Sequence, residues 1–392
     1  MIYLDNSATT KQYDEVTEAM LQYMKQDFGN PSALYQLGVD AEKAVRNARA
    51  QVLGAAFGGK TGDWDVVFTS GGTEADNMAI LGAAKAMKRA GNRIVTTKVE
   101  HPAVLECCKR LEEDGFEIIR VGVDAKCRLN MDELENAIND NTILVTMMHV
   151  NNEIGTVMPV DSVKEIMKKK GAPGLFHCDA VQSFGKMQLP KGADLISVSG
   201  HKIHGPKGSG ALLVRKGKTA AGTNINLPAF IVGGGQESGK RSGTENVPAI
   251  IGLGTAAEMV GNGTKYADAA ALGQLREKLK AGLEANIEDI VINTPMDESC
   301  PTVLSVSFMG CRGEVLLHTL EQDEIYVSTG SACSSNKKGQ SHVLEAMGLK
   351  PKQIEGTLRF SLGRFNTEED IDTCIEKGTA AVKRFRKLGT FR

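Results

Sequence analysis

The alternation of strands and helices between residues 65 and 215 limits the possible folds of this chain more than any other feature. Short apolar segments predict strands at 65–68, 93–97, 117–121, 143–148, 175–178 and 194–199, and periodic segments predict helices near 73–90, 101–113, 131–139 and 160–170. Repeated units of this kind form a largely parallel sheet with helices on both faces. A strand at 211–215 is expected to return antiparallel. We therefore expect an α/β fold that binds its ligand beyond the carboxyl ends of the strands.

The flanking segments predict a second, smaller unit. An extended segment at 2–10 and helices at 13–26 and 36–57 precede the alternating region. After it, helices at 247–261 and 265–287 lead to strands at 303–308, 325–328 and 357–361 and helices at 313–322, 341–346 and 367–387. A chain of 392 residues is too long for one compact core. We predict a large α/β domain over 13–260 and a smaller α+β domain built from 1–12 and 261–392.

Composition and charge exclude several classes of protein. A formal net charge of -2 and a pI near 6.4 give no electrostatic footprint for direct binding to nucleic acid or to a membrane surface. The N-terminal residues lack the pattern of a secretory signal. Eight scattered cysteines without a C-x-x-C pair are typical of reduced thiols rather than of disulfides or a zinc site. We expect a cytoplasmic protein with a small-molecule ligand and no metal.

A lysine at the end of a predicted strand is the first candidate catalytic residue. The apolar run at 195–198 leads to Lys202, and small residues follow at 205, 206, 208 and 210. Small residues let a compact ligand approach the backbone, and a partly desolvated lysine has a lowered pKa and can act as a nucleophile. Taken alone, the segment would fit a solvated surface loop better.

Two earlier strand ends carry residues that could bind the same ligand. The segment 69–74 opens a helix, where the backbone of Gly72 and the hydroxyl of Thr73 could bind a phosphate. A helix cap made by Thr73 and Asp76 explains the same residues equally well. His101 stands just before a helix and could stack on an aromatic ligand or transfer a proton, although a solvated loop histidine is the simpler explanation.

Two later strand ends complete the set. The segment 149–155 contains Asn152, whose amide could bind oxygens of a ligand, or it is an asparagine-rich turn. Asp179 ends the fifth strand, and a buried carboxylate there needs a cation, for which a protonated pyridine nitrogen would serve. With Lys202 as the amine for a Schiff base, these residues match the requirements of pyridoxal 5′-phosphate.

These motifs together resemble those of the cysteine desulfurases of the NifS/IscS type, within the class V aminotransferase group. That group has the fold-type-I architecture of pyridoxal-phosphate enzymes, which implies a mainly parallel seven-stranded sheet and a smaller α+β domain. The resemblance runs from end to end of the chain, through the motifs at 3–10, 70–74, 100–102, 151–155, 179–183, 200–202, 241–246, 330–333 and 359–364.

The resemblance implies a role for each matching residue around the cofactor. Lys202 would bind the cofactor as a Schiff base and remove the substrate α-proton. Asp179 would pair with the pyridinium nitrogen, His101 would stack on the ring, and Gln182 would bond its 3′ oxygen. The phosphate would be held by Gly72, Thr73, Ser199 and His201.

The resemblance also implies a substrate site and a dimer. Asn152, next to the cofactor, and Arg359 would bind the substrate carboxylate, a task that suits the fork of a guanidinium. Thr244 would reach the phosphate of the other subunit's cofactor, so a homodimer is expected.

Cys333 matches the nucleophile that accepts sulfur in this family. The expected reaction converts L-cysteine to L-alanine and leaves a persulfide on Cys333, which then passes to an acceptor protein for iron–sulfur cluster assembly or for thiolation of tRNA or cofactors. The segment 328–340 around it is small and polar, and is expected to be mobile. Lys337 and Lys338 could favour the thiolate, although a solvated charge pair is the simpler explanation.

Three rival functions fit the same residues, and three positions depart from the family pattern. The rivals are a selenocysteine lyase, an ordinary aminotransferase, and a non-enzymatic delivery protein that has lost its cofactor. Tyr35 stands where many relatives have a histidine, and Ser238 and Lys240 stand where an arginine and an apolar residue are usual. The shape of the entrance to the site and the identity of the sulfur acceptor therefore stay open.

Overall fold

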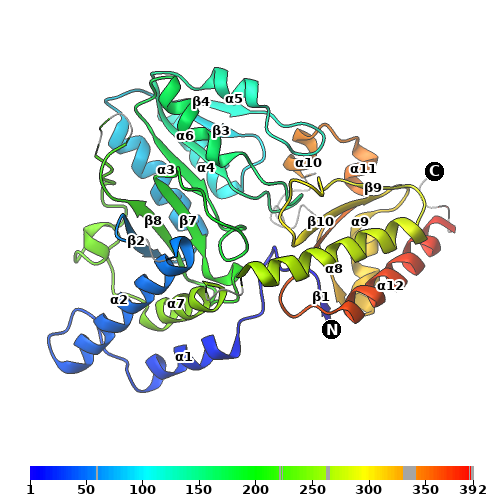
Figure 1. The fold of residues 1–392 in the computed structure, drawn as a ribbon, viewed down its shortest axis with the longest axis horizontal. Coiled ribbons are helices and arrows are strands. Elements are labelled where there is room, and N and C mark those ends of the chain that lie inside the picture. Colours follow the sequence, from blue (N-terminus) through cyan, green and yellow to red (C-terminus); the bar gives the residue numbers. More distant parts are fainter. Residues whose placement is uncertain are drawn as a thin grey trace.

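The central feature of the fold is a twisted sheet between two layers of helices (Figure 1). The computed structural model describes residues 1–58, 61–219, 222, 224–261, 265–329, 341–387 and 389. Within these residues seven strands form the central sheet, in the order β2-β8-β7-β6-β5-β3-β4. In sequence order they are β2 (Trp64–Thr69), β3 (Arg93–Thr97), β4 (Glu117–Val121), β5 (Thr142–Met148), β6 (Leu175–Asp179), β7 (Leu195–Ser199) and β8 (Gly210–Arg215).

The sheet is mainly parallel, as the sequence predicts. Each neighbouring pair from β4 to β7 is parallel, and β8 runs antiparallel to both β7 and β2. The inner strands β5, β6 and β7 are buried along their whole length, because helices cover both faces. All five strands from β3 to β7 therefore end at one edge of the sheet, where a ligand site is expected.

The two faces of the sheet belong to two separate hydrophobic clusters. Leu144, Leu175 and Leu195 pack with α3 (Gly72–Met87) and α4 (Pro102–Glu113) on one face. Residues of the opposite parity, such as Phe176 and Val198, face the other cluster. That cluster includes residues of α2 (Gln36–Phe57), α5 (Met131–Ala137), α6 (Val160–Lys169) and α7 (Val247–Gly261).

A second sheet and its helices form the C-terminal part of the chain. Its strands are β9 (Ile290–Ile292), β10 (Val303–Phe308) and β12 (Thr357–Ser361), antiparallel in the order β12-β10-β9. The helices are α8 (Lys265–Asn286), α9 (Gly313–Gln322), α10 (His342–Ala346), α11 (Pro351–Glu355) and α12 (Glu368–Lys387). A third cluster, which contains Leu283, Phe308 and Phe360, forms the core of this part. In Figure 1, α8 leads away from the large sheet toward it.

The N-terminus joins this C-terminal part, as expected. β1 (Ile2–Tyr3) pairs in parallel with β11 (Ile325–Tyr326), and Leu4 is fully buried in the C-terminal cluster. The chain then crosses to α1 (Asp14–Lys25), which packs against α7 beside the large sheet. The division into domains at 13–260 and at 1–12 with 261–392 stays a prediction.

The apolar side chains of α1 and α2 are only partly buried. Val16 is fully buried, but Met24 is 57% exposed and Leu37 is 41% exposed. Leu34 and Tyr35, in the turn between these helices, are also exposed. A helical pattern identifies an apolar face and does not identify what covers it. No helix in the described ranges is long and apolar enough to span a membrane.

Candidate active site

The loops at the carboxyl edge of the large sheet bring most of the predicted site residues together. Lys202 lies in a short 3-10 turn, η1 (Gly200–Lys202), directly after β7, and Asp179 is the last residue of β6. Thr73 follows β2 at the start of α3, His101 caps α4 after β3, and Asn152 follows β5. Parallel strands thus place residues from five distant segments at one edge.

The start of α3 forms an open cradle with the turn after β7. A pocket there is lined by residues that include Gly72, Thr73, Ser199 and His201. A Cβ atom at Gly72 would lie 2.7 Å from Val181 Cγ2, so the close approach of these loops requires a glycine. Asp76 does not cap the helix, because its carboxyl group contacts Ser197 and lies near His177 instead. The first backbone N–H groups of α3 are suited to an anion such as phosphate.

Asp179 is a buried carboxyl group beside this cradle. It is 5% exposed, and its Oδ1 accepts a hydrogen bond of 2.9 Å from the backbone N–H of Val181. Burial raises its pKa to about 6, against the opposing effects of the Val181 N–H and of the Lys202 charge. A cationic group next to Asp179 would offset the cost of burying its charge.

The amine of Lys202 is held by the N-terminal segment. Its Nζ donates to the carbonyl oxygens of Ser7 at 2.5 Å and Ala8 at 2.7 Å. Gln182 Nε2 donates to the same Ser7 oxygen at 2.9 Å, and His201 Nδ1 lies 3.1 Å from Thr9 Oγ1. The N-terminal segment therefore contacts Lys202, Gln182 and His201, a role that we did not predict from its sequence.

His101 presents a neutral ring toward the site. Its Nδ1 accepts a hydrogen bond of 3.1 Å from the backbone N–H of Ala103, so the ring is fixed as the cap of α4. Burial, with smaller effects of Lys202 and His342, lowers its pKa to about 4. A neutral, rigidly oriented imidazole is suited to stacking on a flat ligand ring.

Arg359, in β12 of the second sheet, reaches the edge of the large sheet. Its Nη1 donates to the carbonyl oxygen of Asn152 at 2.9 Å, and its Nη2 donates to Asp5 Oδ1 at 2.6 Å. The side chain is buried, and its Nε is without a hydrogen-bond partner among the described atoms. Backbone hydrogen bonds in both directions also join Arg359 to Ser328. One guanidinium therefore joins the N-terminal segment, the loop after β5 and the second sheet.

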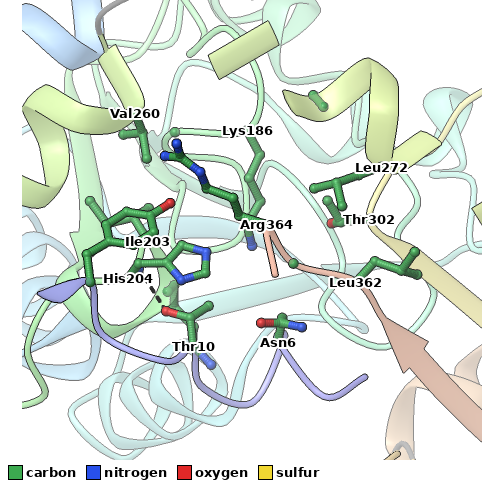
Figure 2. A pocket seen from close by; sticks show the side chains of 15 residues that line it. Asn6, Thr10, Lys186, Ile203, His204, Val260, Leu272, Thr302, Leu362 and Arg364 are labelled. Carbon is green, nitrogen blue, oxygen red and sulfur yellow. Dashed lines mark hydrogen bonds between the residues drawn. The ribbon is translucent and has the colours of Figure 1, made fainter. Parts of the chain in front are cut away.

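A second pocket lies on the other side of Lys202 (Figure 2). It is lined by residues that include Asn6, Lys186 and Arg364, and Figure 2 shows the amine of Lys186 pointing into the space between the other two. Lys186 Nζ lies 3.4 Å from Gln182 Oε1, and burial lowers its pKa. Lys186 was not among the predicted site residues, since a lysine after a glycine has no distinctive pattern.

Two of the predicted site residues are not placed with the others. Thr244 is exposed in the segment before α7, near the ion pair between Arg241 and Glu74 but outside the pocket lined by Thr73. Its predicted contact with a second subunit stays a prediction. Cys333 lies outside the described residues. No group of three or more histidine, cysteine, aspartate or glutamate residues in the described part of the chain could hold a metal ion.

Comparison with known proteins identifies the family. The family model "Aminotransferase class-V" matches residues 2–374. A cysteine desulfurase of Trichormus azollae is 43% identical over 397 residues, which cover 100% of this chain and 95% of that protein. The chain therefore belongs to the class-V aminotransferase family, and the resemblance seen in the motifs is confirmed.

Solved structures share the fold along the whole chain. A NifS-like protein superimposes with a TM-score of 0.88 at 37% identity, covering 98% of this chain and 99% of the other. SspA in complex with cysteine gives a TM-score of 0.77 at 32% identity, covering 94% of this chain and 100% of SspA. The predicted fold class, an α/β protein with a mainly parallel seven-stranded sheet, is confirmed.

Proposed function

We propose that this protein is a pyridoxal-phosphate-dependent cysteine desulfurase, which converts L-cysteine to L-alanine and leaves a persulfide on Cys333. The observation that carries the proposal is the meeting of Lys202, Asp179, Arg359 and the open start of α3 at one sheet edge. The proposal is supported by full-length similarity to a cysteine desulfurase and by the fold shared with a protein solved in complex with cysteine.

The residues at the sheet edge fit the cofactor. Gly72, Thr73, Ser199 and His201 would hold its phosphate, because they line one pocket at a helix N-terminus where a side chain at 72 would not fit. Asp179 would pair with the ring nitrogen, His101 would stack on the ring, and Gln182 would bond the 3′ oxygen. Bound pyridoxal phosphate would supply a sink for the electrons left on the substrate α-carbon when its proton is removed.

The side chains would then divide the reaction between them. Arg359 and Asn152 bind the carboxylate of L-cysteine and orient its Cα–H toward Lys202, which takes the proton at Nζ. The thiolate of Cys333 attacks the substrate sulfur, so that an S–S bond forms and the Cβ–S bond breaks. The carbon takes the electron pair of that bond and then a proton, which gives the methyl group of L-alanine.

We further propose a cytoplasmic homodimer that delivers its sulfur to an acceptor protein for iron–sulfur clusters or for thiolation of tRNA or cofactors. Thr244 is available for contact with a second subunit, since it is exposed in the single chain. The acceptor itself can be identified by capturing the persulfide-bearing complex from cells and sequencing the bound partner.

A product analysis tests the proposed reaction. Protein loaded with pyridoxal phosphate and supplied with L-cysteine and a reducing thiol is expected to form L-alanine and sulfide in equal amounts. Formation of a keto acid would instead indicate an aminotransferase, and turnover of L-selenocysteine without L-cysteine would indicate a selenocysteine lyase. Colourless protein that takes up no cofactor would contradict any of these enzymes.

Replacement of Arg359 should separate substrate binding from the later chemistry. Arg359→Ala is expected to raise the KM for L-cysteine roughly 10- to 100-fold, because hydrogen bonds to charged groups contribute about 1.5–3 kcal/mol. The cofactor should still bind, as measured by its visible absorbance. Arg359→Lys serves as the control that keeps the charge and loses the fork. An unchanged KM in the alanine variant would exclude Arg359 from carboxylate binding.

A further inference from the structure

A row of polar side chains crosses the large sheet just below the proposed cofactor site. Thr146 in β5 and His177 in β6 are direct neighbours in the sheet register, and Ser197 in β7 is the register partner of Asp179. His177 Nδ1 lies 2.8 Å from Thr146 Oγ1, and His177 Nε2 lies 2.9 Å from Ser197 Oγ. Thr146, His177 and Ser197 are completely buried. Apolar side chains usually fill such positions, so a hydrogen-bonded row here calls for an explanation.

The side chain of Asp76 reaches this row of polar residues from α3, the helix that covers this face of the sheet. Asp76 lies in α3, whose first turn forms the proposed phosphate cradle, and it is 1% exposed. The hydroxyl of Ser197 faces its carboxyl group. Its Oδ1 lies 3.6 Å from His177 Nε2 and has no hydrogen-bond partner among the described atoms. Asp76 therefore joins the phosphate helix to the strands that end in Asp179 and Lys202.

No cation among the described residues is in contact with Asp76. Asp179 and His177 face it from β6, Glu100 from the loop after β3, and Cys107 from α4. His177 is neutral, because burial lowers its pKa to about 3. Burial, with a further contribution from Asp179, raises the pKa of Asp76 well above its usual range.

The carboxyl groups of Asp76, Glu100 and Asp179 differ in the donors that face them. Glu100 accepts from the hydroxyl of Thr97 at 2.7 Å and from the backbone N–H of Met148. Asp179 accepts from the N–H of Val181 and is near the charge of Lys202. Among the described donors Asp76 faces only the hydroxyl of Ser197, and its Oδ1 accepts no hydrogen bond. Because a buried anion requires several donors or a cation, Asp76 is the group least able to hold a negative charge.

We propose that Asp76 is a positioning residue that stays a neutral carboxylic acid and so leaves Asp179 as the ionised carboxylate beneath the ring nitrogen. This inference rests on the proposed cofactor and adds the means by which the protein keeps one charge, rather than two, at that position. A neutral Asp76 donates its proton to Ser197 Oγ, Ser197 donates to His177 Nε2, and His177 donates from Nδ1 to Thr146. The row thereby fixes the ends of β6 and β7 relative to α3.

Two variants of Asp76 separate a neutral acid from an anion. Asp76→Asn keeps the shape and the ability to donate, and it is neutral by construction. Asp76→Leu keeps a similar branched shape but removes the polar group that faces Ser197, whose hydroxyl is then left with His177 alone. The asparagine variant should bind pyridoxal phosphate within about twofold of the unaltered protein, whereas the leucine variant should bind it roughly tenfold more weakly, as expected for one unsatisfied buried hydrogen bond. Binding is measured by cofactor titration with visible absorbance.

Infrared spectroscopy gives a readout that does not depend on the cofactor. The unaltered full-length chain at neutral pH should show C=O stretching absorbance of protonated carboxyl groups, with and without pyridoxal phosphate. Burial raises the pKa of Glu100 to about 8, so Glu100 contributes to this absorbance in every variant. The difference spectrum between the unaltered protein and Asp76→Asn should therefore show the loss of one protonated carboxyl band. An unchanged spectrum in Asp76→Asn, or cofactor binding as weak in Asp76→Asn as in Asp76→Leu, would overturn the proposal. If the unaltered protein binds no cofactor at all, the proposed function is wrong. The infrared comparison would still show in that case whether Asp76 is protonated.

Discussion

A Cys333→Ser variant is expected to bind pyridoxal phosphate normally and to form neither alanine nor sulfide from L-cysteine. A serine hydroxyl cannot accept sulfur as a persulfide, and the thiolate is the nucleophile in such transfers. We expect the loss of activity to exceed about 10²-fold, on the scale of a positioned catalytic group. Alanine release and sulfide release are measured together with the visible absorbance of the bound cofactor.

The other cysteines provide the control for this experiment. All seven cysteines within the described residues are buried. Burial raises the pKa of the Cys107, Cys108 and Cys374 thiols to about 12, so these groups are protonated at neutral pH. Cys374→Ala, in the core of the second sheet's cluster, should therefore retain turnover. Full activity in Cys333→Ser would contradict the proposed sulfur acceptor, and loss of activity in Cys374→Ala alone would indicate a fold defect.

Lys202→Ala should abolish both the lysine-bound form of the cofactor and the reaction. The variant removes the amine that forms the Schiff base and also the base that takes the α-proton, and general-base catalysis alone contributes about 10²- to 10⁴-fold. Lys202→Arg keeps a positive charge next to Asp179 but cannot form the Schiff base, so it separates the two losses. The measurements are visible absorbance, cofactor retention and alanine formation.

Lys186 is the residue that could contradict this assignment. Its amine is partly desolvated and has a lowered pKa, and Lys186 lines a pocket together with Lys202. Reduction of the loaded protein with borohydride, followed by peptide mass spectrometry, identifies the lysine that carries the cofactor. Cofactor attached to Lys186, or visible absorbance that persists in Lys202→Ala, would overturn the proposed role of Lys202.

Most of the large sheet could be predicted from the sequence, because its strands are short apolar runs between amphipathic helices. The prediction for 93–97 matches β3, and the prediction for 117–121 matches β4. β9 (Ile290–Ile292) and α11 (Pro351–Glu355) were missed. A strand of three residues and a helix of five residues are too short to show their periods, so contacts with neighbouring elements determine them rather than their own composition.

Site residues that stand at strand ends could be predicted from the sequence, whereas those that are placed by tertiary contacts could not. Asp179, Lys202 and Thr73 could be selected because each stands where a strand meets a loop at the expected ligand edge. The hydrogen bond between Asp5 and Arg359 joins residues 354 positions apart, and no local pattern predicts it. Asp76 has a helix position that suits a cap, and its contact with Ser197 follows only from the packing of α3 on the sheet.

The contacts of the N-terminal segment determine which fragments of this protein could keep an intact site. Its carbonyl groups accept hydrogen bonds from Lys202 and Gln182, its Asp5 carboxylate pairs with Arg359, and its first strand belongs to the C-terminal part. A fragment that contains the large sheet alone would retain Asp179 and Lys202 but would lose the acceptors that orient the amine. The active site therefore needs residues from both the large-sheet part and the part that contains the N-terminal segment and the second sheet. Cutting the chain at the predicted domain boundaries would divide the site.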